Sequence, residues 1–224
     1  MPLDELLQRL GAAIAPELLE LALTHSSFAY ENGGENNERL EFVGDSILGY
    51  LVAVYVFENH SDLNEGEMTK LKNAVVSAAA LSAAANRIDL GSYLRLGKGE
   101  ELTRGREKTN LLADAFEAVL GAAYLSGGID AAKAIVDAHV IPLLDDPVGV
   151  RESADPKTSL VEKLAKLSME PPRYELSAEG PDHERTYSAT CFSGEVELSR
   201  GSATSKRAAE TVAAIAALRE LANN

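Results

Sequence analysis

The sequence predicts two domains of different classes, an all-α domain followed by a small α+β domain of order αβββα. Apolar residues recur at spacings of three and four through residues 1–146, which is the pattern of helices that bury one face. After residue 156 the pattern changes to one helix, three alternating segments and a last Ala-rich helix. Residues 147–156 between them have the polar, Pro- and Gly-containing composition of a linker. We therefore expect domains at 1–146 and 157–224.

Local signals support the helices of the first domain. Pro16 suits a first helical turn, and Asn64 followed by Glu67 resembles a capping box. The pair Gly127-Gly128 should stop a helix, and the glycine- and charge-rich stretch 91–110 should form a long loop. The expected helices are 3–10, 16–25, 36–58, 65–76, 78–87, 111–126 and 130–139.

The second domain is predicted from a change of period. Alternating apolar and polar residues favour strands at 173–178, 186–192 and 195–200. A helix at 158–167 precedes these strands, and a helix at 205–221 follows them. This order is αβββα.

Composition excludes several classes of protein. The single cysteine, Cys191, excludes internal disulfides and thiolate zinc clusters, and a buried strand position suits it. No apolar run approaches the roughly 18 residues of a membrane span, and the first residues carry Asp4 and Glu5 where a signal peptide would be basic. We expect a cytoplasmic protein without a membrane partner. The net charge is −14, of which −12 falls in residues 1–150 and −2 in residues 151–224.

The run NERLEFVGDSIL carries three acids, Glu38, Glu41 and Asp45, on one edge of an apolar helix. Phe42 and Leu48 flank this edge, so we expect it to be shielded from open water. Like charges held this close in a low dielectric cannot all stay ionised unless a cation lies among them. The other helix face carries Leu40, Val43, Ile47, Leu51 and Val54.

A second acidic pair, Asp114 and Glu117, lies on one face of the apolar helix LLADAFEAVLGAAYL. If the two helices face each other, Glu41, Asp45, Asp114 and Glu117 would form an all-oxygen cage suited to Mg²⁺ or Mn²⁺. The alternative is that each acidic pair is only a solvated helix face.

Other polar residues carry weaker signals. Glu65 lies in a first helical turn, where the dipole favours an acid without any catalytic role. His25 lies at a helix end, where capping or stacking is a commoner role than metal binding. Lys206 and Arg207 follow a cap at Thr204 or Ser205 and could bind phosphate with the free amide groups of the helix, although they could equally be two solubilising charges.

Taken together, NERLEFVGD, Glu65-Gly66 and LLADAFEAVLGAAYL resemble bacterial ribonuclease III, and the αβββα segment resembles its double-stranded RNA-binding domain. The resemblance implies a homodimeric endoribonuclease that cleaves double-stranded RNA, with Mg²⁺ as cofactor and Mn²⁺ as a substitute. Each of its two sites would cut one strand, leaving 5′-phosphate and 3′-hydroxyl ends with short 3′ overhangs. A role in rRNA and other RNA processing would follow.

The resemblance also implies residue roles. The metal ligands would be Glu41, Asp45, Asp114 and Glu117, with Asp45 and Glu117 the least dispensable for catalysis, and Glu38 and Glu65 would line the cleavage groove. The RNA-binding residues would be Thr158, Glu162, Pro181, Asp182, His183, Lys206 and Arg207.

Departures from the family pattern at Val161, Ser202-Ala203 and Glu210 predict modest RNA affinity. Ser26 stands where the family often has arginine, a departure that leaves the six acids intact. Two alternatives stay open. One is a double-stranded RNA-binding protein that does not cleave, and the other is an all-α metal phosphohydrolase acting on small pyrophosphates.

Overall fold

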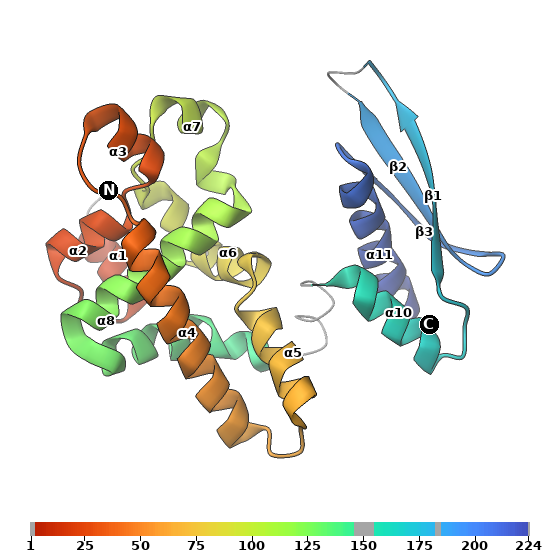
Figure 1. Cartoon of the computed structure of the whole chain (residues 1–224), viewed down its shortest axis with the longest axis horizontal. Helices are drawn as coiled ribbons and strands as arrows, with labels where there is room; N and C mark the ends of the chain where they lie inside the picture. The colour runs from red at the N-terminus through yellow and green to blue at the C-terminus, as the bar shows by residue number, and fades with distance from the viewer. Residues whose placement is uncertain (1–2, 146–154, 182–184, 224) are drawn as a thin grey trace. The chain divides into compact units, whose positions relative to one another are not determined.

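The computed structural model describes residues 3–145, 155–181 and 185–223, and these divide into two compact units, Met1–Val150 and Arg151–Asn224 (Figure 1). Each unit is described by itself. Most of the expected linker, 147–156, lies outside the described residues.

Helices make up most of the described part of the first unit, and the β-structure in that part is one isolated bridge between Thr24 and Arg95, which confirms the predicted all-α domain. Its α-helices are α1 (Leu3–Leu10), α2 (Pro16–Ala22), α3 (Ser26–Asn32), α4 (Glu38–Asn59), α5 (Glu65–Val75), α6 (Ala78–Arg87), α7 (Lys98–Leu102) and α8 (Thr109–His139). Short 3₁₀ turns are η1 (Leu90–Tyr93), η2 (Gly105–Glu107) and η3 (Ile141–Asp145).

Helix α8 forms the centre of the first unit, and α4 packs along it (Figure 1). Its buried side chains include Leu112, Phe116 and Leu120. By length and composition alone α4 and α8 could each cross a membrane, contrary to the expectation from the sequence. This is weak evidence, because the core helix of a helical domain passes the same test, and here the two helices pack on each other.

The structure confirms the predicted capping box and the predicted glycine break. The side chain of Asn64 accepts from the Glu67 N–H at 3.0 Å, and the Glu67 carboxylate accepts from the Asn64 N–H at 3.0 Å, so the capping box is present. Gly128 has φ 72° and ψ −164° inside α8, which breaks the helix where the Gly-Gly pair predicted a stop.

Two expectations for the first unit were wrong. The predicted helix 16–25 ends at Ala22, because His25 is extended and caps a separate helix, α3. The predicted loop 91–110 contains η1, α7 and η2. These helices have five residues or fewer, which is too short for apolar periodicity to reveal them.

The second unit has the predicted αβββα order: α10 (Pro156–Lys166), β1 (Pro172–Glu179), β2 (Thr186–Ser193), β3 (Val196–Ala203) and α11 (Lys206–Asn223). The strands form an antiparallel sheet of order β1-β2-β3, and α11 packs on β2 and β3. Cys191 is fully buried in β2, as expected, and pairs with Tyr174 of β1. The core of the second unit includes Leu160, Leu164, Ala189, Ala213 and Ala217.

Candidate active site

Two glycines let α4 and α8 approach backbone to backbone. A Cβ added at Gly44 would lie 1.7 Å from the Glu117 carbonyl oxygen, and one added at Gly121 would lie 2.2 Å from the Leu40 carbonyl oxygen. No larger residue fits either position without separating the helices. This contact sets Glu41, one turn before Gly44, beside Glu117, one turn before Gly121.

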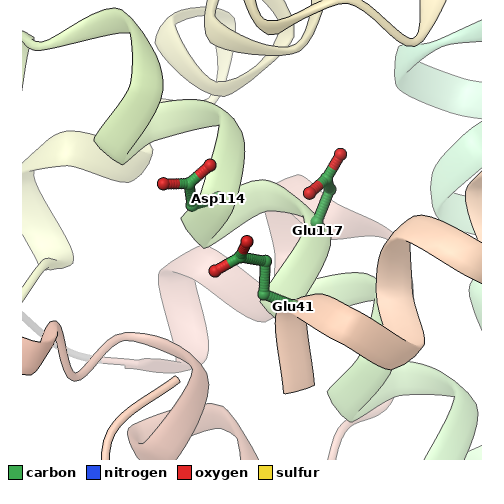
Figure 2. A group of neighbouring side chains, drawn as sticks. All are labelled: Glu41, Asp114 and Glu117. Atoms are coloured by element: carbon green, nitrogen blue, oxygen red, sulfur yellow. The ribbon is translucent and has the colours of Figure 1, made fainter. Parts of the chain in front are cut away.

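The carboxylates of Glu41, Asp114 and Glu117 converge at this crossing (Figure 2). Each offers one oxygen, and these oxygens all lie within 4.8 Å of one another. All three side chains are partly buried. The structure therefore brings together three of the four acids expected to form one cage.

Burial and mutual repulsion disfavour ionisation of the cluster. Burial, followed by the charges of Asp45, Glu41 and Asp114, raises the pKa of Glu117 to about 8. The pKa of Glu41 is also raised, by burial and then by its acidic neighbours. Burial raises the pKa of Asp114, while His25 acts in the opposite direction. A cation among these groups would relieve both penalties.

The fourth expected ligand, Asp45, is exposed and lies outside the group of three oxygens. It follows Glu41 by one turn of α4, and its charge is close enough to raise the pKa of both Glu117 and Glu41. Asp45 is therefore adjacent to the cluster, and its role as a ligand stays a prediction.

The two remaining acids lie apart from the three oxygens. Glu38 is exposed in the first turn of α4, and its charge contributes to the raised pKa of Glu41. Glu65 is exposed at the start of α5, where its carboxylate accepts from the Thr69 hydroxyl at 3.2 Å. Glu65 lines a hollow together with Phe57 of α4. Phe57 lies about four turns, or roughly 24 Å, along α4 from Glu41. Within one chain Glu65 therefore does not join the acidic cluster.

Phe42 corrects the expectation that the acidic edge of α4 is shielded from water. Leu48 is buried, but Phe42 is 76% exposed in the single chain. Two further aromatic side chains of α4 are also exposed, Phe57 at 71% and Tyr50 at 58%. Val54, expected on the apolar face, is also 36% exposed. At 100° per residue, Phe42, Tyr50 and Phe57 fall within an arc of about 80° and form one exposed aromatic face of α4.

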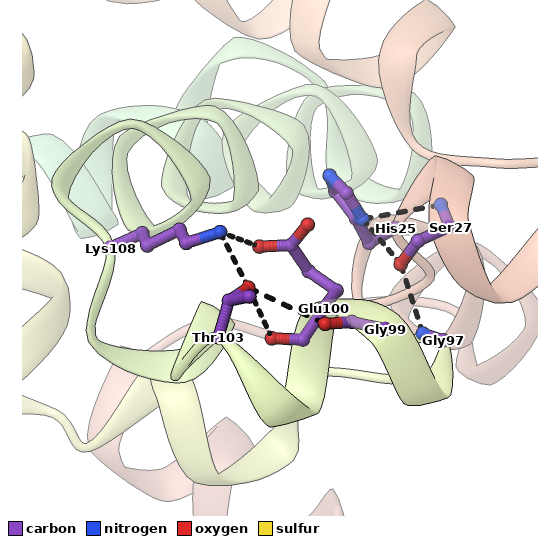
Figure 3. Close-up of polar contacts among 7 residues, drawn as sticks. All are labelled: His25, Ser27, Gly97, Gly99, Glu100, Thr103 and Lys108. Atoms are coloured by element: carbon purple, nitrogen blue, oxygen red, sulfur yellow. Dashed lines mark hydrogen bonds and ion pairs between the residues drawn. The ribbon is translucent and has the colours of Figure 1, made fainter. Parts of the chain in front are cut away.

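A polar network that the sequence did not reveal holds the segment leading into α8 (Figure 3). His25 caps α3 through Nδ1, which accepts from the Ser27 N–H at 3.2 Å, and the Ser27 hydroxyl accepts from the Gly97 N–H at 2.9 Å. Lys108, at the start of α8, pairs with Glu100 of α7 and donates to the Thr103 hydroxyl. The network fixes the end of α8 that carries Asp114. His25 does cap a helix, but it caps the start of α3 and not the end of the expected helix 16–25.

The second unit exposes most of the residues expected to bind RNA. Thr158 and Glu162 are exposed on α10, and Pro181 is exposed after β1. Lys206 and Arg207 are exposed in the first turn of α11, where the Ser205 hydroxyl accepts from the Ala208 N–H at 3.2 Å and so supplies the expected cap. Asp182 and His183 lie outside the described residues.

The fold and the acidic cluster define a class: a helical nuclease domain joined to an αβββα RNA-binding domain. Residues 15–144 match the family model described as ribonuclease-III-like, and residues 156–221 match the double-stranded RNA binding motif. The chain belongs to the ribonuclease III family of endoribonucleases.

Relatives agree over nearly the whole chain. It is 50% identical to ribonuclease 3 of Leifsonia xyli subsp. xyli, over 98% of this chain and 93% of that protein. It is 45% identical to ribonuclease 3 of Streptomyces coelicolor, over 95% of this chain and 78% of that protein. A solved nuclease domain of ribonuclease III from Campylobacter jejuni, reported with a flexible region involved in dimer formation, is 34% identical with a TM-score of 0.57, covering 69% of this chain and 99% of that domain.

Proposed function

We propose that this protein hydrolyses phosphodiester bonds of double-stranded RNA with the help of a divalent metal ion. The observation that carries the proposal is the convergence of three carboxylate oxygens within 4.8 Å in a ribonuclease III domain. The same chain carries a double-stranded RNA binding motif, which supplies the substrate class.

The donor set fits Mg²⁺, with Mn²⁺ as a substitute, because both ions prefer carboxylate and water oxygens. Glu41, Asp114 and Glu117 would hold the metal, and Asp45 is the expected fourth ligand. When bound, the metal polarises phosphoryl oxygens and lowers the pKa of coordinated water. The partly buried cluster would hold the ion at the crossing of α4 and α8.

The proposed reaction adds the oxygen of one water molecule to phosphorus and breaks the bond from phosphorus to the 3′ oxygen. The departing 3′ oxygen takes a proton, which gives a 3′-hydroxyl, and the phosphate stays on the 5′ end. Without a cation the cluster repels the RNA backbone, so divalent ions should support productive binding as well as cleavage. Glu38 and Glu65 would line the groove that receives the duplex.

The second unit would hold the duplex through its α10 and α11 surface. Lys206 and Arg207 would contact phosphates, aided by the amide groups at the start of α11. Thr158 and Glu162 would contact the minor groove, where A-form shape and 2′-hydroxyls are recognised. The residues expected to reach the next groove are Pro181, Asp182 and His183.

A homodimer through α4 is the proposed assembly. The exposed aromatic face of α4 is the kind of surface that a partner covers, and the Campylobacter jejuni relative is described with a region involved in dimer formation. Two sites facing opposite strands would produce the short 3′ overhangs. The proposed setting is the cytoplasm, with rRNA and other structured transcripts as substrates and no membrane partner.

The direct test incubates a long RNA duplex with the full-length protein and Mg²⁺, with EDTA and single-stranded RNA as controls. We expect short duplex products with 5′-phosphates and 3′-hydroxyls only when metal and duplex are both present. Full-length duplex after prolonged exposure would favour the non-cleaving alternative. A faster turnover of nucleoside triphosphate than of duplex RNA would favour the small pyrophosphate alternative.

A further inference from the structure

An ion pair lies between the two helices of the second unit, next to the expected phosphate-binding surface. The ammonium group of Lys157, in the first turn of α10, pairs with the carboxylate of Glu210 on α11. Glu210 follows Lys206 and Arg207 by four and three positions, so the three side chains share one face of α11. The pair places the first turn of α10 beside the second turn of α11, one turn along from Lys206 and Arg207.

The cations of this surface differ in whether they already have a partner: Lys157 is held by Glu210 and by the Tyr174 ring. The side chain of Lys157 is 39% exposed and that of Glu210 is 22% exposed. The Lys157 ammonium also lies 5.1 Å from the centre of the Tyr174 ring, a cation–π contact that adds to the pairing. Among the described residues, Lys206 and Arg207 form no ion pair, so their charges are available to a phosphate.

We propose that Glu210 is an internal competitor for RNA phosphate that withholds Lys157 and sets a low affinity for duplex RNA. The inference rests on the proposed RNA-binding function. A phosphate that approaches the starts of α10 and α11 meets three cations, Lys157, Lys206 and Arg207. It also meets two carboxylates, Glu210 and the α10 cap Asp155, and of these only Glu210 is paired with one of the cations. Binding through Lys157 therefore requires the pair to break, which removes part of the gain from that contact.

The competition gives a physical account of how this enzyme could release products. Affinity for duplex RNA rises with every phosphate that is neutralised, and the salt dependence rises with it. A carboxylate among the phosphate-binding cations limits this number without changing the fold of the domain. Glu210 would thereby favour turnover over tight retention of cut duplex.

The test measures duplex binding by full-length protein carrying Glu117→Gln to prevent cutting, over a series of salt concentrations. We expect Glu210→Gln to tighten binding about two- to five-fold, the scale of one partly exposed ion pair. The slope of log affinity against log salt should become steeper by about 1. The gain should disappear when Lys157→Gln is added. Glu197→Gln is the matched control, because it removes a carboxylate paired with Arg200 on β3 and should leave binding unchanged.

Three results would overturn the proposal: unchanged or weaker binding by Glu210→Gln with an unchanged melting temperature, the same gain in the Lys157→Gln background, or the same gain from Glu197→Gln. Failure of the RNA-binding function itself has a separate signature. In that case Lys206→Ala with Arg207→Ala would also leave duplex binding intact. If this double variant weakens binding while Glu210→Gln has no effect, only the competition by Glu210 is rejected.

Discussion

At Glu117 the fold disfavours the ionised form of a carboxyl group. Burial and three nearby acids raise its pKa to about 8, and Glu41 and Asp114 add two further partly buried acids to the same place. An arrangement that costs stability without a ligand is what a cation-binding site requires. The residue types could be read from the sequence, but their degree of burial could not, because it depends on how closely two helices pack.

Metal binding should therefore be visible in the stability of the protein. At a concentration 100 times its Kd, Mg²⁺ should raise the free energy of unfolding of the native protein by about 2.7 kcal/mol. The melting temperature should rise accordingly. Glu117→Gln keeps the shape and removes an acid whose ionisation the fold disfavours, so its metal-free melting temperature should be no lower than that of the native protein, and it should lose the shift with Mg²⁺. Differential scanning fluorimetry with and without EDTA checks this. A full Mg²⁺ shift in Glu117→Gln would remove Glu117 from the metal site.

Asp45 provides a second test at the same scale, since it lies beside the three-oxygen group. We expect Asp45→Ala and Glu117→Ala each to lower cleavage by at least a hundredfold while duplex binding survives, since both leave the second unit unchanged. Gel cleavage and filter binding of the same RNA give the two values. Ser46→Ala, at the next exposed position of α4, serves as the control. Normal cleavage by Asp45→Ala would restrict the site to the other three acids.

His139 makes the stability of the first unit depend on pH. Burial lowers its pKa below the ordinary value of 6.5, so the unfolded chain takes up the proton first as the pH falls. Its contribution to stability is complete above about pH 6.5 and is lost as the pH falls below that value. Melting temperatures from pH 8 to pH 5 should fall less steeply for His139→Gln than for the native protein. Parallel curves would contradict this.

At the scale of elements, the site is created by the contact between α4 and α8. The sequence predicted both helices, the second unit's αβββα order and the acids on each helix, because regular periodicity carries that information. It did not predict that Gly44 and Gly121 are the contact points, since a glycine inside a helix has no sequence signal of its own. It also missed α7, whose five residues are held by Ser27, Glu100 and Lys108 rather than by an apolar pattern.

Gly44 tests that contact. A Cβ at this position would lie 1.7 Å from the Glu117 carbonyl oxygen, so Gly44→Ala should destabilise the protein by about 3 kcal/mol or more and also disrupt the acidic cluster. Gly66→Ala in α5 is the matched control, because its nearest neighbour is at an ordinary contact distance of 3.4 Å. Urea unfolding should show a large loss for the first variant and a change within about 1 kcal/mol for the second. Equal stabilities would mean that the helices can separate at little cost.

At the scale of the whole molecule, the single chain leaves an apolar surface uncovered. The expectation that the acidic edge of α4 is shielded fails for Phe42 in the single chain, because the described residues do not cover that face of the helix. A helical pattern shows which residues share a face, but it does not distinguish a face covered by the same chain from one covered by a second copy.

The proposed dimer should depend on the aromatic face of α4. Phe42→Glu introduces a charge into the aromatic face of α4, so it should convert the dimer into monomers. Sedimentation equilibrium measures this change in oligomeric state. Leu102→Glu is the matched control, because Leu102 is 86% exposed but lies on α7. If the duplex must meet two sites at once, the monomeric variant should lose double-strand cleavage more than tenfold, and cleavage should recover as protein concentration rises. A native protein that sediments as a monomer at micromolar concentration, or a Phe42→Glu variant that stays dimeric, would show that this face has another role.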